Sequence, residues 1–294
     1  MKSDFWYLAS YPKSGNTWVR IFISELINIE KGIDANKCNK NNFGKTIDLN
    51  KNLQTGLILS SRKWFEDQTL LDTGDLSQFE IDNIRCKIGN STPVFYKSKN
   101  RFHKVHDAFT SPNTIGKPIV PTKRCKGVVY IIRNPFDVAV SLSHYFSMDL
   151  ERSVKFLLNK NASIGYLSKF RENQLKQYLG TWSNHVNSWT NQNKIPLLAI
   201  KYEDLINKGE TYFRKIASFL KISDNHESIN LAIKNSSFSV VKKKERLYGF
   251  QENENKNTFF FRKGQVGEGK KMIKPEYQSL ITNEFKDVLR KFDY

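Results

Sequence analysis

The feature that most constrains the fold is an uninterrupted run of apolar and aromatic residues at Val128–Ile132, followed directly by residues that start helices. Such a run is typical of a strand buried on both faces of a parallel sheet. Asn134 can cap a helix and Pro135 suits its first turn, so we expect a helix to about Phe146. A buried strand, a short loop and a helix form the repeating unit of an α/β fold.

The same unit recurs along the chain. Phe5–Ser10 predicts a short buried strand, and apolar residues between Trp18 and Ile29 recur at helical spacing. Further strands are expected at Arg101–Val105 and Leu197–Lys201, and further helices at Ile81–Ile88, Leu175–Gln192, Tyr212–Leu220, Ile229–Lys234 and from Pro275 onward. Residues 242–269 are predicted as a long loop. The sequence thus predicts a parallel β-sheet flanked by helices.

One domain is expected over residues 1–294, with variable excursions near 34–93 and 147–172. A length of 294 residues and a hydrophobic content of 39% suit one large α/β domain. No apolar run approaches the roughly 20 residues of a membrane-spanning helix, and the apolar stretch near the N-terminus is too short for a secretory signal. We therefore expect no membrane partner and a cytoplasmic location.

The net charge of +18 would favour an anionic partner such as a nucleic acid or a nucleotide, but it can equally serve solubility alone and decides nothing by itself. Lysines and arginines are spread along the chain, with one local cluster at 242–246, and no nucleic-acid recognition module accompanies them. An anionic nucleotide would benefit from the same charge. The three cysteines, Cys38, Cys86 and Cys125, have neither zinc spacing nor the even number of a disulfide framework.

The loop after the first strand, Tyr11–Trp18, has the composition of an anion site. Gly15 permits an unusual turn, and the unpaired N–H groups of the following helix favour an anion. Lys13 adds a full positive charge. Side-chain donors come from Ser14, Asn16 and Thr17. Because the lysine precedes the glycine, this is not the Walker pattern, in which the lysine follows the second glycine.

Three other segments carry residues suited to anion binding or proton transfer. Arg133, at the end of a strand, can clamp a phosphate or pair with Asp137, and Ser141 lies two turns into the next helix. Arg262–Gly264 opens a glycine-rich loop that can fold over a phosphate. His106 follows the strand at 101–105, where an imidazole can act as a general base. Structural roles are expected for His103, His144, His185 and His226.

Together these segments resemble the PAPS-dependent sulfotransferase family, in its cytosolic and bacterial small-molecule branch. The Pro-Lys-Ser-Gly-x-Thr-Trp loop is similar to the family's 5′-phosphosulfate loop, and Arg133–Ser141 to its 3′-phosphate motif. Lys104-Val105-His106 resembles the Lys-Thr-His signature that holds the catalytic base. Later matches are Tyr202–Asp204, Ser236–Phe238 and Arg262–Gly264. The matches follow the family's order over roughly residues 5–270.

The resemblance implies an activity of the EC 2.8.2 class in a P-loop-like nucleotide-binding fold, with PAPS as cosubstrate and PAP as product. It implies a small-molecule acceptor, no metal and no specific nucleic acid, and leaves the oligomeric state open. Catalytic roles are implied for Lys13, Lys104 and His106. The implied nucleotide contacts are Lys13, Ser14, Gly15, Asn16, Thr17, Trp18, Arg133, Ser141, Tyr202, Ser236, Phe238, Arg262, Lys263 and Gly264.

Two departures from the family pattern stand out. The late motif usually continues Gly-Asp-Trp-Lys, whereas this chain has Gly267-Glu268-Gly269-Lys270, so its loop must close without the tryptophan. The C-terminal dimer motif of many animal members is not recognisable after Lys270. Dimerisation therefore cannot be transferred to this chain.

The acceptor is expected to contact loops near 58–75 and 149–169. Trp64, Phe65, Phe146 and Tyr166 are candidates for an apolar wall, with core packing as the alternative. Asp72, Asp75 and Asp149 prompt the hypothesis of a cationic acceptor such as a guanidinium alkaloid, sulfated on a hydroxyl or an amine. Two rival functions are a P-loop kinase that uses ATP and a divalent metal, and a basic nucleic-acid-binding protein without catalysis.

Overall fold

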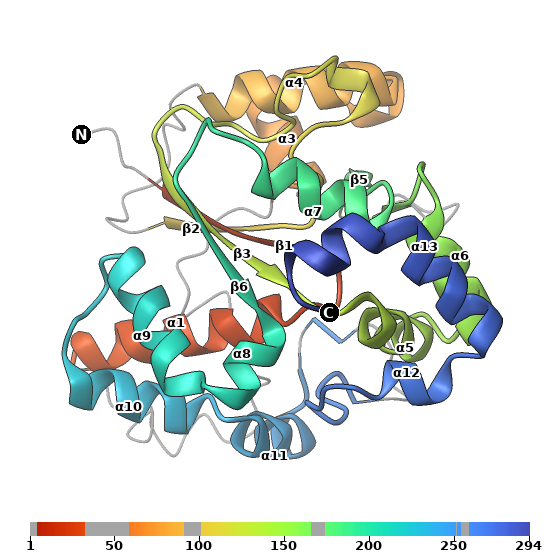
Figure 1. The fold of residues 1–294 in the computed structure, drawn as a ribbon. Coiled ribbons are helices and arrows are strands. Elements are labelled where there is room, and N and C mark those ends of the chain that lie inside the picture. The colour runs from red at the N-terminus through yellow and green to blue at the C-terminus, as the bar shows by residue number, and fades with distance from the viewer. Residues whose placement is uncertain (1–4, 33–58, 91–100, 166–173, 251, 254–258) are drawn as a thin grey trace.

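The computed structural model describes residues 5–32, 59–90, 101–165, 174–250, 252–253 and 259–294 (Figure 1). Four parallel strands form the central sheet in the order β2-β1-β3-β6: β1 (Phe5–Ser10), β2 (Arg101–Val105), β3 (Cys125–Ile132) and β6 (Leu197–Lys201). A short antiparallel pair joins β4 (Ser163–Ile164) to β5 (Gln177–Tyr178). The parallel sheet and its helices confirm the predicted fold class.

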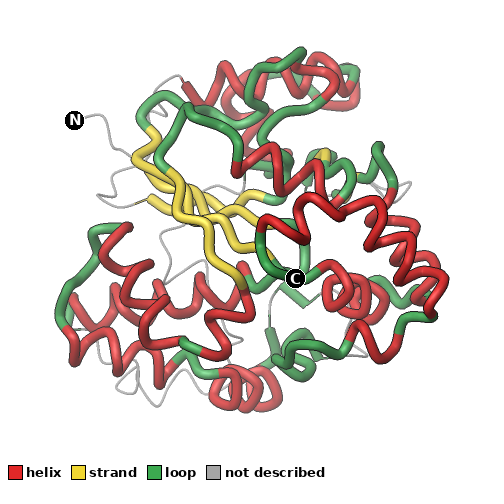
Figure 2. The backbone as a smooth tube through the Cα atoms, viewed as in Figure 1, coloured by secondary structure: helices red, strands yellow, loops and turns green. Residues whose placement is uncertain are grey.

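Helices cover both faces of the sheet, and Figure 2 shows the strands between the helical layers. One face packs against α3 (Arg62–Thr69), α4 (Gln78–Asn90), α5 (Pro135–Tyr145), α6 (Leu150–Leu158), α7 (Trp182–Thr190) and α13 (Pro275–Lys291). The other face packs against α1 (Asn16–Glu30), α8 (Tyr202–Asn207), α9 (Gly209–Phe219), α10 (His226–Asn235) and α11 (Phe238–Tyr248). A short helix, α12 (Gly269–Met272), precedes α13.

The alternation of side chains along each strand divides the core between these faces. Tyr7 and Tyr130 belong to the cluster under α7, whereas Leu8 and Val129 belong to the cluster under α1. All four side chains are fully buried. The strands therefore read as continuous apolar runs because both of their faces are covered.

The register of the sheet places three loops at one edge. Ala9 pairs with Val105, and Ser10 pairs with Ile131. Because the strands are parallel, the residues that follow β1, β2 and β3 leave the sheet on the same side. Ligands of open parallel sheets bind at this carboxyl edge.

The predicted strands are confirmed, but one helix starts later and one loop is shorter than expected. The segment predicted as a helix from Leu175 contains β5, and α7 begins at Trp182 after Gly180 with φ of 65°. Thr181 caps α7 by accepting a hydrogen bond from the backbone N–H of Asn184 at 3.1 Å. The first part of the predicted loop at 242–269 is helical, because α11 continues to Tyr248.

The expected excursions fall partly outside the described residues. Residues 33–58, 91–100 and 166–173 are not described, and the prediction for Tyr166 falls among them. Residues 59–90, between the first two of these ranges, contain α3 and α4, which pack on each other and on the sheet.

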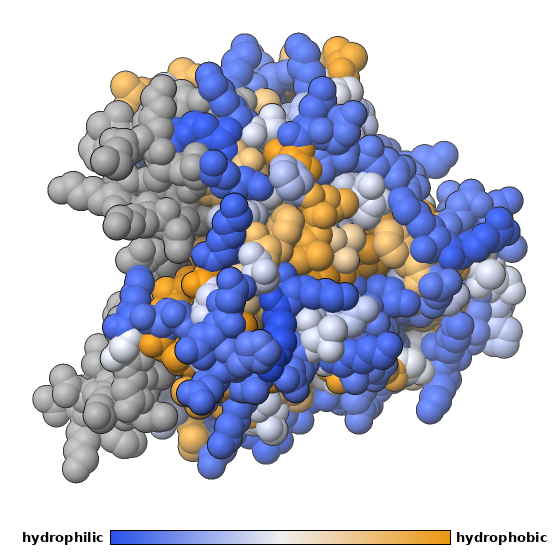
Figure 3. Space-filling model, turned by 60° about the vertical axis from the view of Figure 1, so that its left-hand side comes forward, coloured by the Kyte–Doolittle hydropathy of each residue, from blue (hydrophilic) through white to orange (hydrophobic). Residues whose placement is uncertain are grey.

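The space-filling view shows mostly hydrophilic residues around a central apolar area (Figure 3). A hydrophilic surface agrees with the high charge of the chain. In the part of the chain that the structure describes, no helix combines the length and the apolar composition that crossing a bilayer requires.

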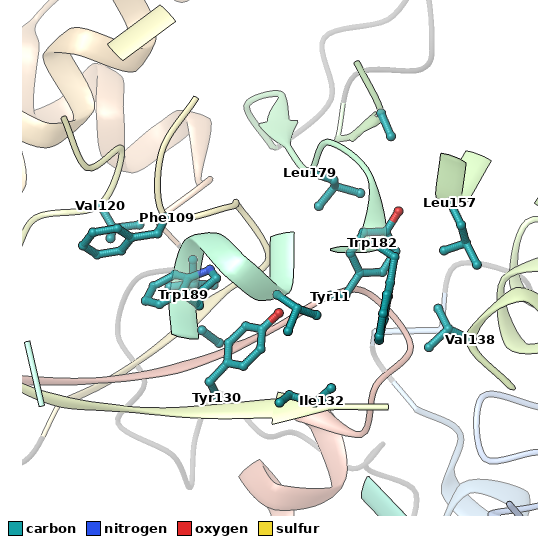
Figure 4. Packing of buried hydrophobic residues seen from close by; sticks show 14 of the residues in the cluster. Tyr11, Phe109, Val120, Tyr130, Ile132, Val138, Leu157, Leu179, Trp182 and Trp189 are labelled. Atoms are coloured by element: carbon teal, nitrogen blue, oxygen red, sulfur yellow. The ribbon is translucent and has the colours of Figure 1, made fainter. Parts of the chain in front are cut away.

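A buried polar network crosses the core beside β2. Figure 4 shows Trp189 close to Tyr130 in this core, and the indole N–H of Trp189 donates to the carbonyl of Asp107 at 3.0 Å. The two terminal guanidinium nitrogens of Arg85, Nη1 and Nη2, donate to the Asp107 carboxylate at 3.0 and 2.7 Å. The two side chains are at most 2% exposed. The pair thus ties α4 to the residue that directly follows His106.

We expect the substitution Arg85→Met to lower the free energy of unfolding by about 3–5 kcal/mol, because it leaves the Asp107 carboxylate buried without its cation. Urea denaturation measures the change. Arg152→Met is the control, since Arg152 forms an exposed ion pair with Asp149 on α6. Equal losses in the two variants would contradict the structural role of the buried pair.

Candidate active site

A cavity of about 730 Å³ lies at the carboxyl edge of the sheet. Most of the residues expected at a nucleotide site line it: Lys13, Gly15, Asn16, Thr17, Trp18, Lys104, His106, Arg133, Ser141, Tyr202, Phe238, Arg262, Lys263 and Gly264. Ser14 and Ser236 are fully buried behind this lining. The structure therefore brings together segments that are more than 200 positions apart in the chain, such as those of Lys13 and Gly264.

The loop between β1 and α1 has an unusual backbone. Lys13 has φ of 66° and Gly15 has φ of 99°, both in the left-handed region. A Cβ atom at Gly15 would lie 2.6 Å from the ring of Tyr202, so only glycine fits there. No side chain caps the start of α1, and its first N–H groups remain available to a ligand.

Three polar atoms of this loop and of the first residue of α1 lie buried without a hydrogen-bond partner among the described residues. They are Oη of Tyr11, Oγ of Ser14 and Oδ1 of Asn16. The amide nitrogen of Asn16 donates to the carbonyl of Leu8 at 2.9 Å, so this side chain also fixes the loop on β1. A buried polar group normally has a partner, and a bound anion or water can supply it.

The ammonium group of Lys13 lies between two aromatic rings. Its Nζ atom is 4.0 Å from the ring centres of both Tyr145 and Phe260. Burial and the charges of Arg133 and Lys104 lower the pKa of Lys13 to about 7. The amine is therefore close to its point of half-ionisation at neutral pH.

His106 is held as a neutral imidazole with a defined tautomer. Burial and the charge of Lys104 lower its pKa to about 3. Its Nδ1 atom lies 2.9 Å from the carbonyl oxygen of Ser10, which can only accept a hydrogen bond, so Nδ1 carries the proton. Nε2 is then left with the lone pair that a general base requires.

A second histidine supports the backbone of the first. Nε2 of His185 donates to the carbonyl of His106 at 3.0 Å, and its Nδ1 accepts from the hydroxyl of Tyr130 at 2.7 Å. Burial lowers the pKa of His185 to about 4, which keeps this ring neutral as well. The structural role expected for His185 agrees with these contacts.

Arg133 connects the loop between β1 and α1 with the glycine-rich loop at residues 262–269, the late loop. It donates to the carbonyls of Lys13 at 3.0 Å and of Gln265 at 3.2 Å, and its guanidinium lies 4.4 Å from the ring centre of Tyr202. Asp137, its alternative partner in the sequence, instead accepts hydrogen bonds from the late loop. Arg133 thus remains part of the cavity wall.

The late loop closes on α5 without a tryptophan. The Asp137 carboxylate accepts from the backbone N–H groups of Gly267 at 2.8 Å and of Gly269 at 2.7 Å. A Cβ atom at Gly269 would lie 2.2 Å from the backbone carbon of Phe136. The missing side chain at position 269 therefore lets the loop pack directly on the helix backbone.

Aromatic residues form another part of the cavity wall. Trp18 donates its indole N–H to the carbonyl of Ser236 at 2.8 Å, and its ring packs edge-on against Tyr202. At Gly264, a Cβ atom would lie 2.5 Å from the ring of Phe238. Ser236 thus contributes by orienting Trp18 rather than by lining the cavity.

Two lining carboxylates had no assigned role in the sequence. Glu252 lies 2.8 Å from buried Arg20 and 3.3 Å from Lys104, and these charges outweigh burial and lower its pKa to about 2. Glu268 contacts both Arg262 and Lys263. The sequence does not predict these ion pairs, because the partners are not at helix or strand spacing and meet only through the conformation of the loops that carry Glu252 and Glu268.

The remaining lining residues are apolar or neutral. They include Tyr145, Phe146, Ile164, Gly165, Gln174, Gln177 and Phe260. Of the residues expected near an acceptor, Phe146 lines the cavity, whereas Trp64 and Phe65 are buried in the core. Within the described ranges, no group of three or more His, Cys, Asp or Glu residues could hold a metal ion.

We expect Asp137→Ala to release the late loop, because it removes the acceptor of two backbone hydrogen bonds. Cleavage by trypsin after Arg262 or Lys263 should become roughly tenfold faster, and mass spectrometry of the fragments measures it. Asp149→Ala, an exposed cap of α6, serves as the control. Unchanged cleavage at 262–263 in the Asp137 variant would refute this account of loop closure.

Comparison with known proteins gives one consistent result. The profile of the sulfotransferase domain family matches residues 3–293. A 3-beta-hydroxysteroid sulfotransferase of Cavia porcellus is 33% identical over 220 residues, which cover 73% of this chain and 70% of the relative. Sulfotransferase 1B1 of Canis lupus familiaris is 26% identical over 97% of this chain and 81% of its own.

A solved structure shares the fold. The mouse sulfotransferase SULT7A1, crystallised with PAP, superposes with a TM-score of 0.53 at 22% identity, over 99% of this chain and 86% of its own. The parallel sheet, the cavity at its carboxyl edge and the match over nearly the whole chain lead to one conclusion. This chain belongs to the sulfotransferase domain family.

Proposed function

We propose that this sulfotransferase moves a sulfuryl group from PAPS to a hydroxyl group of a small-molecule acceptor, with His106 as the general base. The observation that carries the proposal is the neutral imidazole of His106 in the same cavity as Lys13 and Arg133. The PAP in the mouse neighbour's structure supports the choice of donor.

The residues present fit a nucleotide with two separate anionic groups. Uncapped N–H groups of α1 and the partnerless Oγ of Ser14 offer donors to the 5′-phosphosulfate. Arg133 keeps a buried Nε without a partner in the described part of the chain, and with Ser141 and Arg262–Gly264 it would hold the 3′-phosphate. Trp18, Tyr202 and Phe238 offer ring surfaces to the adenine.

The proposed chemistry is an in-line displacement, for which positioning and electrostatics supply most of the catalysis. The donor supplies a sulfur atom with a good leaving group. Nε2 of His106 accepts the proton of the acceptor hydroxyl as the new O–S bond forms. Lys13 stabilises the charge that grows on the phosphate oxygen as the old S–O bond breaks, and Lys104 steadies the sulfuryl oxygens.

The rest of the cavity indicates a neutral acceptor. Phe146, Ile164 and Phe260 offer apolar contacts, and the amides of Gln174 and Gln177 offer hydrogen bonds. The acids that prompted a cationic acceptor, Asp72, Asp75 and Asp149, lie outside this lining. Asp72 instead caps a short 3₁₀ helix at Thr73–Asp75, and Asp149 caps α6.

An assay with sulfur-labelled PAPS and a panel of phenols, alcohols, sugars and amines tests the proposal. Transfer to neutral hydroxyl compounds is expected, and transfer to guanidinium compounds alone would contradict the acceptor assignment. Titrations with ATP–magnesium and with random DNA test the rival functions. The cytoplasmic location stays a prediction.

We expect His106→Ala to lower turnover about 100-fold or more, because it removes the base. Affinity for PAP, measured by calorimetry, should change little. His226→Ala, an exposed histidine at the start of α10, is the control. Turnover equal to that of the control would reject His106 as the base.

Binding of PAP at pH 8 should take up a proton. The free protein has a largely neutral Lys13, because its pKa is about 7, and a bound anion raises that pKa. Affinity should therefore increase as the pH falls from 8 towards 7. Calorimetry in buffers of different ionisation enthalpy measures the uptake.

Lys13→Met should abolish this proton uptake, whereas Lys286→Met on the exposed side of α13 should retain it. The difference between the two variants isolates Lys13 from the ionisation of the ligand itself. Equal uptake in both would show that another group titrates.

A further inference from the structure

The late loop carries its own anion. Arg262 and Lys263, the two cations of this loop, both contact the carboxylate of Glu268. Arg262 contributes two nitrogens, and its Nη1 donates to Oε1 at 3.3 Å. A carboxylate held by an arginine fork and a lysine occupies the same donors that a bound phosphate would use.

The carboxylate lies where the proposed ligand would have to bind. Glu268 lines the cavity together with Ser141, Arg262, Lys263 and Gly264, the residues assigned to the 3′-phosphate. Its side chain is 17% exposed. The N–H groups of Arg262 and Lys263 that bind Glu268 are not free to bind a phosphate. A phosphate at the same site would also be repelled by the carboxylate.

The loop cannot easily move Glu268 away. The residues on either side, Gly267 and Gly269, donate their N–H groups to Asp137, and Gly269 packs on the backbone of Phe136. Hydrogen bonds from Arg262, with those from Lys263, outweigh burial and lower the pKa of Glu268 to about 2. The Glu268 carboxylate therefore stays ionised at physiological pH and close to the proposed 3′-phosphate site.

We propose that the carboxylate of Glu268 competes with the nucleotide's 3′-phosphate for Arg262 and Lys263. This competition weakens the binding of PAP and so favours product release. The inference rests on the proposed function and adds an affinity-determining residue to it. Before the nucleotide binds, Glu268 also satisfies two cations that would otherwise repel each other.

Calorimetry with two ligands tests the competition. PAP carries the 3′-phosphate, and adenosine 5′-phosphate lacks it. Glu268→Gln removes the competing charge and keeps the size of the side chain, so it should bind PAP about tenfold more tightly while its affinity for adenosine 5′-phosphate stays within about twofold. Inhibition by product PAP in the sulfuryl-transfer assay should tighten in parallel.

Three further variants control for charge and folding. Glu284→Gln makes the same change of charge at an exposed site on α13 and should leave both affinities unchanged. Glu268→Asp keeps the charge and should bind PAP within about threefold of the wild type. Glu268→Ala also removes the charge and keeps the test decisive if the glutamine variant does not fold.

The outcomes separate the inference from the proposed function. Weaker or unchanged PAP binding in Glu268→Gln would overturn the inference alone. Weaker binding would in addition show that Glu268 orients the cations for the phosphate. Parallel tightening for both ligands would also overturn it, as a general effect of charge. A wild-type chain that binds neither PAP nor PAPS would overturn the proposed function together with the inference.

Discussion

The parallel pairing of β1 with β2 and β3 is the constraint on which the site depends. It sets Ser10 beside Ile131 and Ala9 beside Val105, so the loops after these strands leave the sheet together. The same pairing places the carbonyl of Ser10 next to the imidazole of His106. Sheet register therefore decides both which residues meet and which nitrogen of the ring is protonated.

The strands and the cavity could be predicted because their signals are local. Val128–Ile132 is apolar throughout since both faces are covered, and the loop at Lys13–Asn16 carries its turn glycine and its cation within four residues. The start of α7 could not be predicted correctly, because the apolar spacing from Leu175 imitates a helix. In the structure Gly180 adopts a left-handed backbone conformation, Thr181 caps the helix, and α7 begins only at Trp182.

The charge balance of the cavity could not be predicted in this way. Glu252 reaches Arg20 across more than 200 positions, and Glu268 turns back on Arg262 and Lys263 within its own loop. No periodicity encodes such contacts. The hypothesis of a cationic acceptor likewise rested on sequence position alone, because it assumed that Asp72 and Asp149 face the acceptor from their loops. In the structure both residues cap helices.

The aromatic pair around Lys13 has a chemical consequence. Tyr145 and Phe260 pack against an amine that burial and neighbouring cations leave partly unprotonated at neutral pH. A neutral primary amine is a nucleophile, while exposed lysines remain protonated under the same conditions. Among the lysines that the structure describes, Lys13 is therefore one with the intrinsic reactivity to attack a small acylating reagent that enters the cavity.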